Sequence, residues 1–392
     1  MKLKAAIYDP YLDTLGGGER YCLTVGEILL EQGYEVDIFW SGNQEIISQA
    51  EKRFGLKLKG INCVPDVFGL THRKIDLIED ANQDTLHSKS FPKVGIFQKI
   101  KNFILKFQIL SGYDIIFYLS DGSIPFLFSK KNILHIQVPF ILKESLKDKI
   151  LNIIKVKFIH QVVCNSQFTS KFLNSFPKDK LKVLYPPVDV KNFYSSDKKS
   201  NIILSVGRFD NILNAKKQDI LIEAFKKIYQ NNPKTDWKLI LMGGSHDLPQ
   251  ENHYLLHLKH LAKDLPIEFI VNPDFDKLKE IYSQAKIYWH AAGFDVDEYL
   301  HPEQTEHFGM TVVEAMDSGA VPMVVAKGGL SEIVSDSKNG FLWQSIEELV
   351  SKTQLLLVTS NDLKNLSTEA QKSSHTFSKQ VFEEKLLNLI KQ

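Results

Sequence analysis

Residues 302–334 read PEQTEHFGMTVVEAMDSGAVPMVVAKGGLSEIV and carry the strongest structural signal in the chain. A helix is expected to begin near Met310, and an apolar strand follows at Pro322–Val325. Glu306 then lies in the loop before the helix, and Glu314 lies in its early turns. A helix that leads into a buried strand is one unit of an α/β sheet.

The same alternation of apolar runs and helical patterns extends outward over the whole chain and occurs twice. In the first half, strands are expected at Leu3–Tyr8, Glu35–Trp40, Ile61–Val64, Ile115–Leu119, Asn132–Ile136, Gln161–Cys164 and Lys182–Tyr185. In the second half, they are expected at Ile202–Val206, Lys238–Met242, Glu268–Val271, Ile287–Trp289 and Pro322–Val325. Helical patterns between them, such as residues 19–32, 219–229 and 253–263, predict parallel sheets with helical crossovers.

The boundary between the halves is expected at residues 185–201, where two prolines and a polar run precede a new buried strand. We therefore predict an α/β protein with two Rossmann-like domains, residues 1–190 and residues 200–375, facing each other across a cleft. The amphipathic residues 376–392 form a final helix that is expected to cross back toward the first domain. Ligands of open α/β sheets bind beyond the carboxyl ends of the strands, so functional residues should lie in those loops.

Composition narrows the function classes. The 392 residues are 43 % hydrophobic and carry a formal net charge of +1, which gives no global field for nucleic acid. Three well-separated cysteines fit neither a disulfide framework nor a metal site. No stretch reaches the roughly 18 to 20 apolar residues that span a bilayer, and MKLKAAIYDPYL predicts a first strand rather than an export signal. We expect a cytoplasmic protein with no nucleic-acid partner.

A glycine-rich loop, DTLGGGERY, follows the first expected strand at Asp13–Tyr21. Glycines allow the backbone to approach a ligand, and the N-terminus of the next helix offers unpaired N–H groups to an anion. A tight strand-to-helix turn is the alternative interpretation.

A basic loop follows the first strand of the second half. Arg208 stands directly after that strand, and Lys216 and Lys217 precede the next helix. A guanidinium and an ammonium at a strand end suit a diphosphate, because both stay charged near neutral pH. A solvated basic turn remains the alternative.

The acidic stretch quoted first adds a third site element. The N–H groups around Phe308, Gly309 and Met310 would point at a phosphate. Two carboxylates beside an anion-binding helix start, Glu306 and Glu314, indicate ligand hydroxyls such as those of sugars. Surface glutamates flanking an ordinary helix are the alternative.

These motifs together resemble those of the retaining GT-B glycosyltransferases of family 4, the glycosyl transferases group 1. Their amino-acid sequences are similar to those of the mannosyltransferase branch. The resemblance covers nearly the whole chain. Its segments, in order, are GGGER (16–20), HIQVPF (135–140), CNSQFTSKF (164–172), YPPVD (185–189), SVGRF (205–209), KKQDILIEAF (216–225), WHAAGF (289–294) and EHFGMTVVEAM (306–316).

The resemblance implies a role for each matching residue. Arg208 and Lys216, with Lys216 preferred over Lys217, would neutralise the donor diphosphate as it leaves. Glu306 would contact the donor sugar and Glu314 the ribose, while the backbone of residues 308–310 would hold the phosphate. Gly17 and Gly18 would approach the donor from the first domain. His135 would lie near the sugar, with a core histidine as the alternative.

The implied reaction moves a hexose from a nucleoside-diphosphate sugar to a glycan or lipid-linked acceptor with retention of configuration. It needs charge stabilisation of the leaving group more than a general acid, and no cofactor or metal is expected. Asp295-Val296-Asp297 looks like a metal-binding Asp-x-Asp motif but is interpreted as loop acids. A nucleotide-sugar epimerase, a glycan phosphorylase, a nicotinamide-dependent dehydrogenase and a non-catalytic sugar-nucleotide-binding subunit are the alternatives.

Residues 89–107, KSFPKVGIFQKIKNFILKF, carry five lysines and no acid. Six apolar residues fall on one helical face, and Lys99 and Lys106 flank that face: Ile96, Phe97, Ile100, Phe103, Ile104 and Phe107. This pattern is typical of a helix on an anionic membrane surface, which would place the protein at the inner membrane face. A helix that packs this face on its own sheet is an equal alternative.

Overall fold

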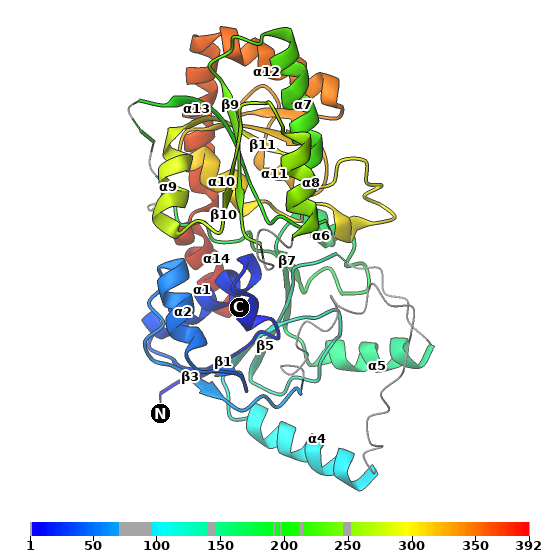
Figure 1. Cartoon of the computed structure of the whole chain (residues 1–392). Helices are drawn as coiled ribbons and strands as arrows, with labels where there is room; N and C mark the ends of the chain where they lie inside the picture. The colour runs from blue at the N-terminus through cyan, green and yellow to red at the C-terminus, as the bar shows by residue number, and fades with distance from the viewer. Residues whose placement is uncertain are drawn as a thin grey trace.

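The computed structural model describes residues 2–69, 96–139, 146–190, 193, 195–196, 198–211, 215–245 and 252–391. They form two α/β domains, and Figure 1 shows these as two lobes stacked along the long axis of the molecule. Each domain contains one parallel sheet with helical crossovers, which confirms the fold class predicted from the alternating sequence pattern.

The N-terminal sheet has seven parallel strands in the order β3-β2-β1-β4-β5-β6-β7. The strands are β1 (Lys4–Tyr8), β2 (Glu35–Phe39), β3 (Ile61–Val64), β4 (Ile115–Leu119), β5 (Lys131–Ile136), β6 (Gln161–Cys164) and β7 (Leu181–Val183). The described helices are α1 (Gly17–Glu31), α2 (Ile46–Phe54), α4 (Ile96–Leu110), α5 (Leu146–Lys157) and α6 (Gln167–Lys171). The central strand β4 is apolar and buried along its whole length, as expected for a parallel sheet covered on both faces.

The C-terminal sheet has six parallel strands in the order β10-β9-β8-β11-β12-β13. They are β8 (Ser200–Val206), β9 (Lys238–Gly243), β10 (Ile267–Val271), β11 (Ala285–His290), β12 (Val321–Val325) and β13 (Phe341–Trp343). The helices are α7 (Gln218–Asn231), α8 (His253–Leu261), α9 (Phe275–Gln284), α10 (Met310–Asp317), α11 (Leu330–Ile333), α12 (Ile346–Val358) and α13 (Ser360–Ser374). Burial of β8, β11 and β12 positions their carboxyl ends, where the candidate residues lie.

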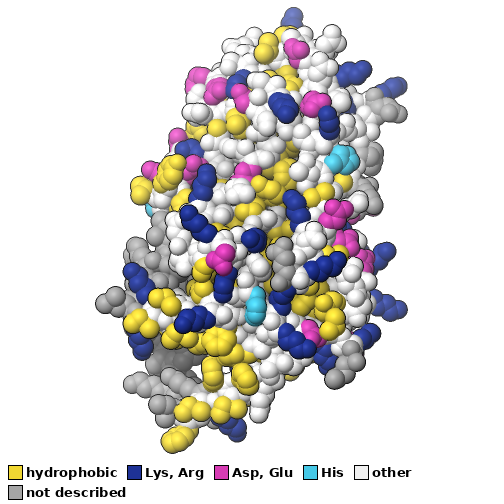
Figure 2. All heavy atoms as spheres, turned by 180° about the vertical axis from the view of Figure 1, so that it is seen from behind, with side chains coloured by type: hydrophobic (Ala, Val, Ile, Leu, Met, Phe, Trp, Pro, Cys, Tyr) yellow, Lys and Arg dark blue, Asp and Glu magenta, His cyan; other side chains and the backbone are white. Residues whose placement is uncertain are grey.

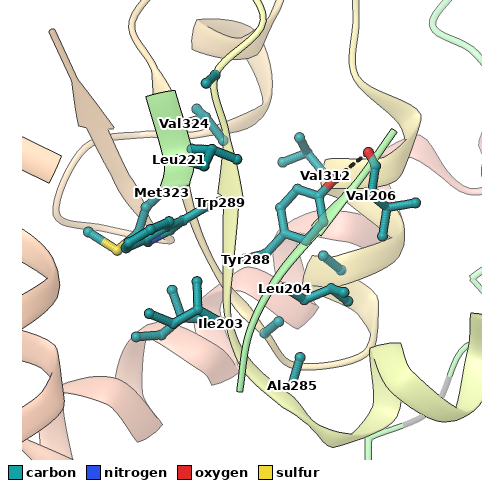
Figure 3. Close-up of a cluster of buried hydrophobic side chains, with 14 of the residues drawn as sticks. Ile203, Leu204, Val206, Leu221, Ala285, Tyr288, Trp289, Val312, Met323 and Val324 are labelled. Atoms are coloured by element: carbon teal, nitrogen blue, oxygen red, sulfur yellow. Dashed lines mark hydrogen bonds between the residues drawn. The ribbon is translucent and has the colours of Figure 1, made fainter. Parts of the chain in front are cut away.

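The core of this second domain centres on β11. Figure 3 shows Trp289 and Tyr288 within the cluster of buried side chains drawn there. The Tyr288 hydroxyl donates a hydrogen bond to the carbonyl oxygen of Val206 at 3.3 Å, so a polar contact ties β11 to the end of β8. The loops that leave β8 and β11 therefore start from fixed positions.

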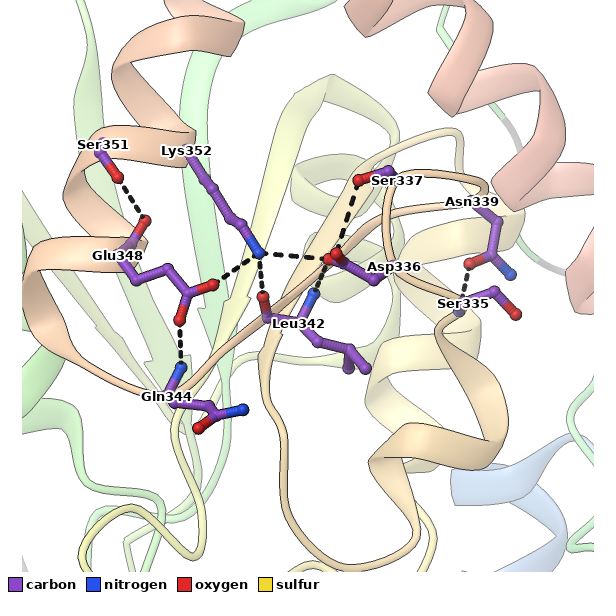
Figure 4. Close-up of polar contacts among 9 residues, drawn as sticks. All are labelled: Ser335, Asp336, Ser337, Asn339, Leu342, Gln344, Glu348, Ser351 and Lys352. Carbon is purple, nitrogen blue, oxygen red and sulfur yellow. Dashed lines mark hydrogen bonds and ion pairs between the residues drawn. The ribbon is translucent and has the colours of Figure 1, made fainter.

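Strand β13 is absent from the sequence prediction. It has three residues, too few for an alternating pattern, and side chains around it supply much of its support. Lys352 of α12 contacts Glu348 at 2.7 Å and donates to the carbonyl oxygen of Leu342 at 2.6 Å, as Figure 4 shows. The Leu342 N–H donates to Asp336 at 2.8 Å. Such tertiary contacts leave no mark on local sequence.

The chain crosses between the domains a second time near its C-terminus. The Val188 N–H donates to the carbonyl oxygen of Phe377 at 2.9 Å, so the two crossings lie side by side. Helix α14 (Lys379–Lys391) then buries Phe382, Leu386 and Leu389 in a core cluster of the N-terminal domain. This double crossing joins the domains at one edge.

Candidate active site

Helices α1 and α10 begin next to each other at the junction of the domains. A Cβ atom placed on Gly17 would lie 2.3 Å from the terminal methyl carbon of Met310, so the two N-termini touch. One turn further along, Arg20 of α1 forms an ion pair with Glu314 of α10 at 3.0 Å. The first-turn N–H groups of a helix have no intrahelical acceptors, and here two such turns from different domains converge.

Glu306 lies at the centre of a buried cluster of charged and polar groups. The Lys216 ammonium contacts its Oε2 atom at 2.6 Å, and Nε2 of His290 lies 3.0 Å from the same oxygen. The Lys216 and Glu306 side chains are 19 % and 12 % exposed. Burial by itself raises the pKa of Glu306, but Lys216 and His290 outweigh burial and hold that pKa well below its usual value. The carboxylate is therefore ionised at neutral pH.

The loop between Glu306 and α10 is held in place by glycines and by Phe308. Gly309 has a φ of 107°, a left-handed conformation that side chains rarely adopt, and it precedes the first residue of α10. The Gly329 N–H donates to the Glu306 carbonyl oxygen at 2.8 Å. The Phe308 side chain is buried in the C-terminal core and packs its ring against Phe377. The backbone of residues 308–310 is thus fixed at the helix start.

Glu314 is buried and engaged from two sides. Arg20 contacts its Oε1 atom, and the Tyr282 hydroxyl donates to Oε2 at 3.1 Å. Burial raises the pKa of Glu314, and the Arg20 guanidinium opposes that shift. The residue expected to bind ribose is therefore also part of the contact between the domains.

The three basic residues of the loop after β8 have different surroundings. The Lys216 side chain crosses the backbone at Gly207, where an added Cβ would lie 2.5 Å from its Cγ atom. Arg208 is 54 % exposed and pairs with Asp210 at 3.1 Å. Lys217 precedes α7 in a left-handed conformation with a φ of 53°. Of the three cations, Lys216 is the one that contacts Glu306.

Comparison with known proteins identifies the class. Residues 189–373 match the family model described as glycosyl transferases group 1. The chain is 27 % identical to the Homo sapiens GDP-Man:Man(3)GlcNAc(2)-PP-Dol alpha-1,2-mannosyltransferase, over 99 % of this chain and 86 % of that protein. The chain is a glycosyltransferase, and its residues 189–373 are similar to the glycosyl transferases group 1.

Solved structures establish the same fold for the glycosyltransferase. A Rickettsia africae ESF-5 glycosyltransferase superposes with a TM-score of 0.73 at 19 % identity, covering 100 % of this chain and 98 % of that one. Anabaena Alr3699/HepE, solved in complex with UDP and glucose, gives a TM-score of 0.66 at 17 % identity and full coverage of both chains. The two sheets and the double crossing therefore constitute a GT-B fold.

His135 of the glycosyltransferase is fully buried in the N-terminal domain. It is on β5 with no exposed surface, its ring stacks on Tyr21 at a centroid distance of 4.0 Å, and its Nδ1 lies 3.2 Å from the Val163 carbonyl oxygen. Burial lowers its pKa to about 3. In this structure His135 is therefore packed in the N-terminal core on the side of β5 that faces α1, as in the core alternative.

Sequence reasoning missed four residues that the glycosyltransferase brings to the site. Gln137, just after β5, would lie 2.5 Å from a Cβ on Gly18, so it reaches the glycine loop that His135 does not reach. His290 contacts Glu306 from the last position of β11, and Arg20 and Tyr282 engage Glu314. His290 and Gln137 were predictable, because both lie at or just beyond the carboxyl end of a parallel strand, where ligands of open α/β sheets bind. The Arg20 contact spans 294 residues and has no local signal.

The Asp-x-Asp sequence has a structural role in a turn. Oδ1 of Asp297 accepts hydrogen bonds from the N–H groups of Tyr299 at 2.9 Å and Leu300 at 3.2 Å. In the part of the chain that the structure describes, no group of three histidine, cysteine or acidic side chains is arranged to hold a metal ion. The same part contains no helix with the length and apolar character that a membrane span requires.

Proposed function

We propose that this glycosyltransferase moves a hexose from a nucleoside-diphosphate sugar to a hydroxyl of a lipid-linked glycan, with retention of configuration and without a metal. GDP-mannose is the first candidate donor, since the name of the human relative specifies GDP-Man and a PP-Dol-linked glycan. UDP-glucose is the competing donor, because UDP and glucose occupy the Anabaena structure.

One observation carries the proposal: an ionised, buried glutamate contacts a lysine and lies just before the start of α10, which adjoins the start of α1. Glu306 supplies a carboxylate for sugar hydroxyls, and Lys216 supplies a positive charge beside it. The backbone at Gly309 and Met310 supplies N–H donors for phosphate. Sugar, phosphate and charge recognition thus lie within one small region.

The chemistry follows from these positions. The bond between the anomeric carbon and the phosphate oxygen breaks, and the acceptor oxygen bonds to that carbon from the same face. The acceptor proton passes to the departing phosphate oxygen. Lys216 and Arg208 would stabilise the negative charge on the leaving group, so they would do the work that a divalent cation does in other transferases. Arg208 would have to exchange Asp210 for the diphosphate.

The nucleoside would bind near Glu314. Its carboxylate accepts from Arg20 and Tyr282 in this structure, and ribose hydroxyls would replace or share those contacts. Because Gly17 and Gly18 carry no side chains, Met310 and Gln137 pack directly against this loop, and these two side chains would have to move for the donor to approach its backbone. Donor binding would therefore involve both domains.

The acceptor would be reached at an anionic membrane surface through α4. Five apolar side chains of its predicted membrane face are between 46 % and 86 % exposed: Phe97, Ile100, Phe103, Ile104 and Phe107. Phe103 and Phe107 also pack their rings against Phe128 of the same domain, so the exposed part of this face consists mainly of Phe97, Ile100 and Ile104. Residues 89–95 lie outside the described part of the chain. Apolar side chains also gather on α5, where Ile150 and Ile153 are 62 % and 64 % exposed.

Lysines accompany both helices, and the lower part of Figure 2 shows hydrophobic and basic side chains intermixed over this end of the molecule. Lys101 lies on α4, and Lys149, Lys155 and Lys157 lie on α5, whereas the Lys106 ammonium of α4 lies over the Phe68 ring at 4.1 Å. Apolar burial and attraction to anionic headgroups would act together on such a surface.

A donor screen tests the reaction. The purified chain is titrated with GDP, UDP, ADP, CMP and NAD in the presence and absence of EDTA, and the melting temperature is followed. Stabilisation by GDP that survives EDTA, together with mannose transfer from GDP-mannose to a lipid-linked acceptor, supports the proposal. Stabilisation by none of the nucleoside diphosphates contradicts it.

Vesicle co-sedimentation tests the membrane surface. Phe97→Asp combined with Ile100→Asp should abolish binding to vesicles that contain phosphatidylserine, without lowering the melting temperature. Leu300→Asp is the matched control, because Leu300 is 65 % exposed but lies in the other domain. Equal binding by both variants, or no binding by the unmodified chain, would reject the membrane role of α4.

A further inference from the structure

His290 is the last residue of β11, and its imidazole is held by two contacts. Nδ1 accepts a hydrogen bond from the Ala292 N–H at 3.2 Å, and Nε2 lies 3.0 Å from Oε2 of Glu306. A main-chain N–H can only donate, so Nδ1 carries no proton. The neutral ring then carries its proton on Nε2, the atom that lies 3.0 Å from Oε2 of Glu306. The loop after β11 thus selects the tautomer that serves the carboxylate.

Two nitrogen atoms lie close to the same oxygen of Glu306. The Lys216 ammonium donates to Oε2 at 2.6 Å from the loop before α7, and Nε2 of His290 approaches it to 3.0 Å from β11. Contacts from two different elements restrict the position of this oxygen. Oε1 is then the oxygen available to accept from a ligand hydroxyl.

We infer that His290 is a positioning residue that holds Oε2 of Glu306 through its Nε2–H group, so that Oε1 faces a hydroxyl of the donor hexose. The inference rests on the proposed role of Glu306 in sugar transfer. Lys216 contributes charge to this arrangement, and His290 contributes direction, since an imidazole has a single N–H vector whereas an ammonium rotates freely.

The pKa shifts of the ionisable groups around Glu306 are consistent with a neutral His290 imidazole. Burial lowers the pKa of His290, against the opposing effect of the carboxylate. The neighbouring His307 is also buried, with its pKa lowered to about 4. Tyr288 is buried and keeps its proton because burial raises its pKa. Lys216 is therefore the cation at Glu306, and removal of the His290 donor should raise the pKa of Glu306.

Three substitutions separate the two contacts of the ring. His290→Gln places an amide N–H near the position of Nε2 and can restore the bond to Glu306. His290→Asn places its amide oxygen near the position of Nδ1, so it can keep the Ala292 contact but cannot reach Glu306. His290→Ala removes both. Gln and Asn thus form a matched pair in which one contact is kept at a time.

The measurement is kcat with saturating donor and acceptor, as a function of pH, together with the dissociation constant of the nucleoside diphosphate. A hydrogen bond to a charged group corresponds to roughly 10- to 100-fold in rate, so Asn and Ala should lose that much in kcat. Gln should stay within about 3-fold of the unmodified enzyme, on the same scale. The acidic limb of the profile should move to higher pH in Asn and Ala only, and nucleotide affinity should be unchanged throughout.

An active Asn variant beside an inactive Gln variant would overturn the inference, because the Ala292 contact would then be the one that matters. A wild-type pH profile in all three variants would also overturn the inference. Glu306→Gln separates this failure from failure of the proposed function. If Glu306→Gln transfers sugar at the normal rate, the role of Glu306 is wrong; if it is inactive while His290→Ala is fully active, only the role of His290 is wrong.

Discussion

Lys216→Met should destabilise the C-terminal domain because it leaves Glu306 ionised and buried without its cation. Methionine keeps the length and apolar stem of lysine, so packing over Gly207 is preserved and the change is mainly one of charge. Loss of one partner from a buried ion pair costs about 3–5 kcal/mol. Both side chains keep slight exposure, 19 % and 12 %, and Nε2 of His290 still lies 3.0 Å from the carboxylate, so we expect about 3 kcal/mol.

This cost should depend on the charge of Glu306, and pH tests that. In the unmodified protein the folded-state pKa of Glu306 is depressed, so its contribution to stability is present above the ordinary carboxyl pKa and is lost only in strong acid. Without Lys216, burial raises that pKa instead. The group then destabilises the fold as pH rises through the raised value, and the deficit of Lys216→Met should shrink between pH 7 and pH 5.

Differential scanning calorimetry measures the effect. For a domain of this size, about 3 kcal/mol corresponds to a fall of roughly 6–12 °C in melting temperature at pH 7. The double variant Lys216→Met/Glu306→Gln should fall by roughly half of that or less, because the unpaired charge is gone. A single variant that melts within about 2 °C of the unmodified protein, or a double variant that shows the sum of the two single effects, would refute the pairing.

Three other changes give contrasting results. Gly309→Ala should lower stability by about 1–2 kcal/mol through its positive φ and should weaken nucleotide binding at the start of α10; unchanged affinity for GDP in calorimetry would contradict a phosphate role for this turn. His135→Gln should retain sugar transfer within a few-fold while lowering the melting temperature, and an inactive, stably folded variant would restore His135 to the site. Arg20→Met should raise the donor KM far more than it lowers kcat, since it leaves Glu314 buried without its cation; an unchanged KM in initial-rate assays would show that the interdomain pair is independent of the nucleotide.

Much of the fold is predictable from the sequence because strand and helix periodicity is local. The apolar runs at Ile115–Leu119 and Gln161–Cys164 coincide with β4 and β6, and errors at other strands are limited to the ends. β13 is too short to produce a pattern. Tertiary contacts to Lys352 and Asp336 support it, and those contacts involve residues that local reasoning treats as surface charge.

The site is predictable in part for the same reason. Glu306 and Lys216 stand beside strand ends in the sequence, and the structure brings them to 2.6 Å. His135 shows the limit, since residues along one strand alternate between faces and a motif match does not say which residue reaches the cleft. Gln137, two positions later, contacts the glycine loop instead. Arg20 and Glu314 meet only because the domains close on each other, which no local pattern encodes.

The most direct test of the account is sugar transfer and nucleotide binding measured on the same preparation of Glu306→Gln. The account predicts that transfer from GDP-mannose falls by at least about 100-fold, as for loss of a contact to the reacting sugar, while GDP binds with nearly unchanged affinity. Equal loss of transfer and of GDP binding would show that Glu306 maintains the structure of the site, and transfer at the normal rate would show that the reaction does not depend on this carboxylate.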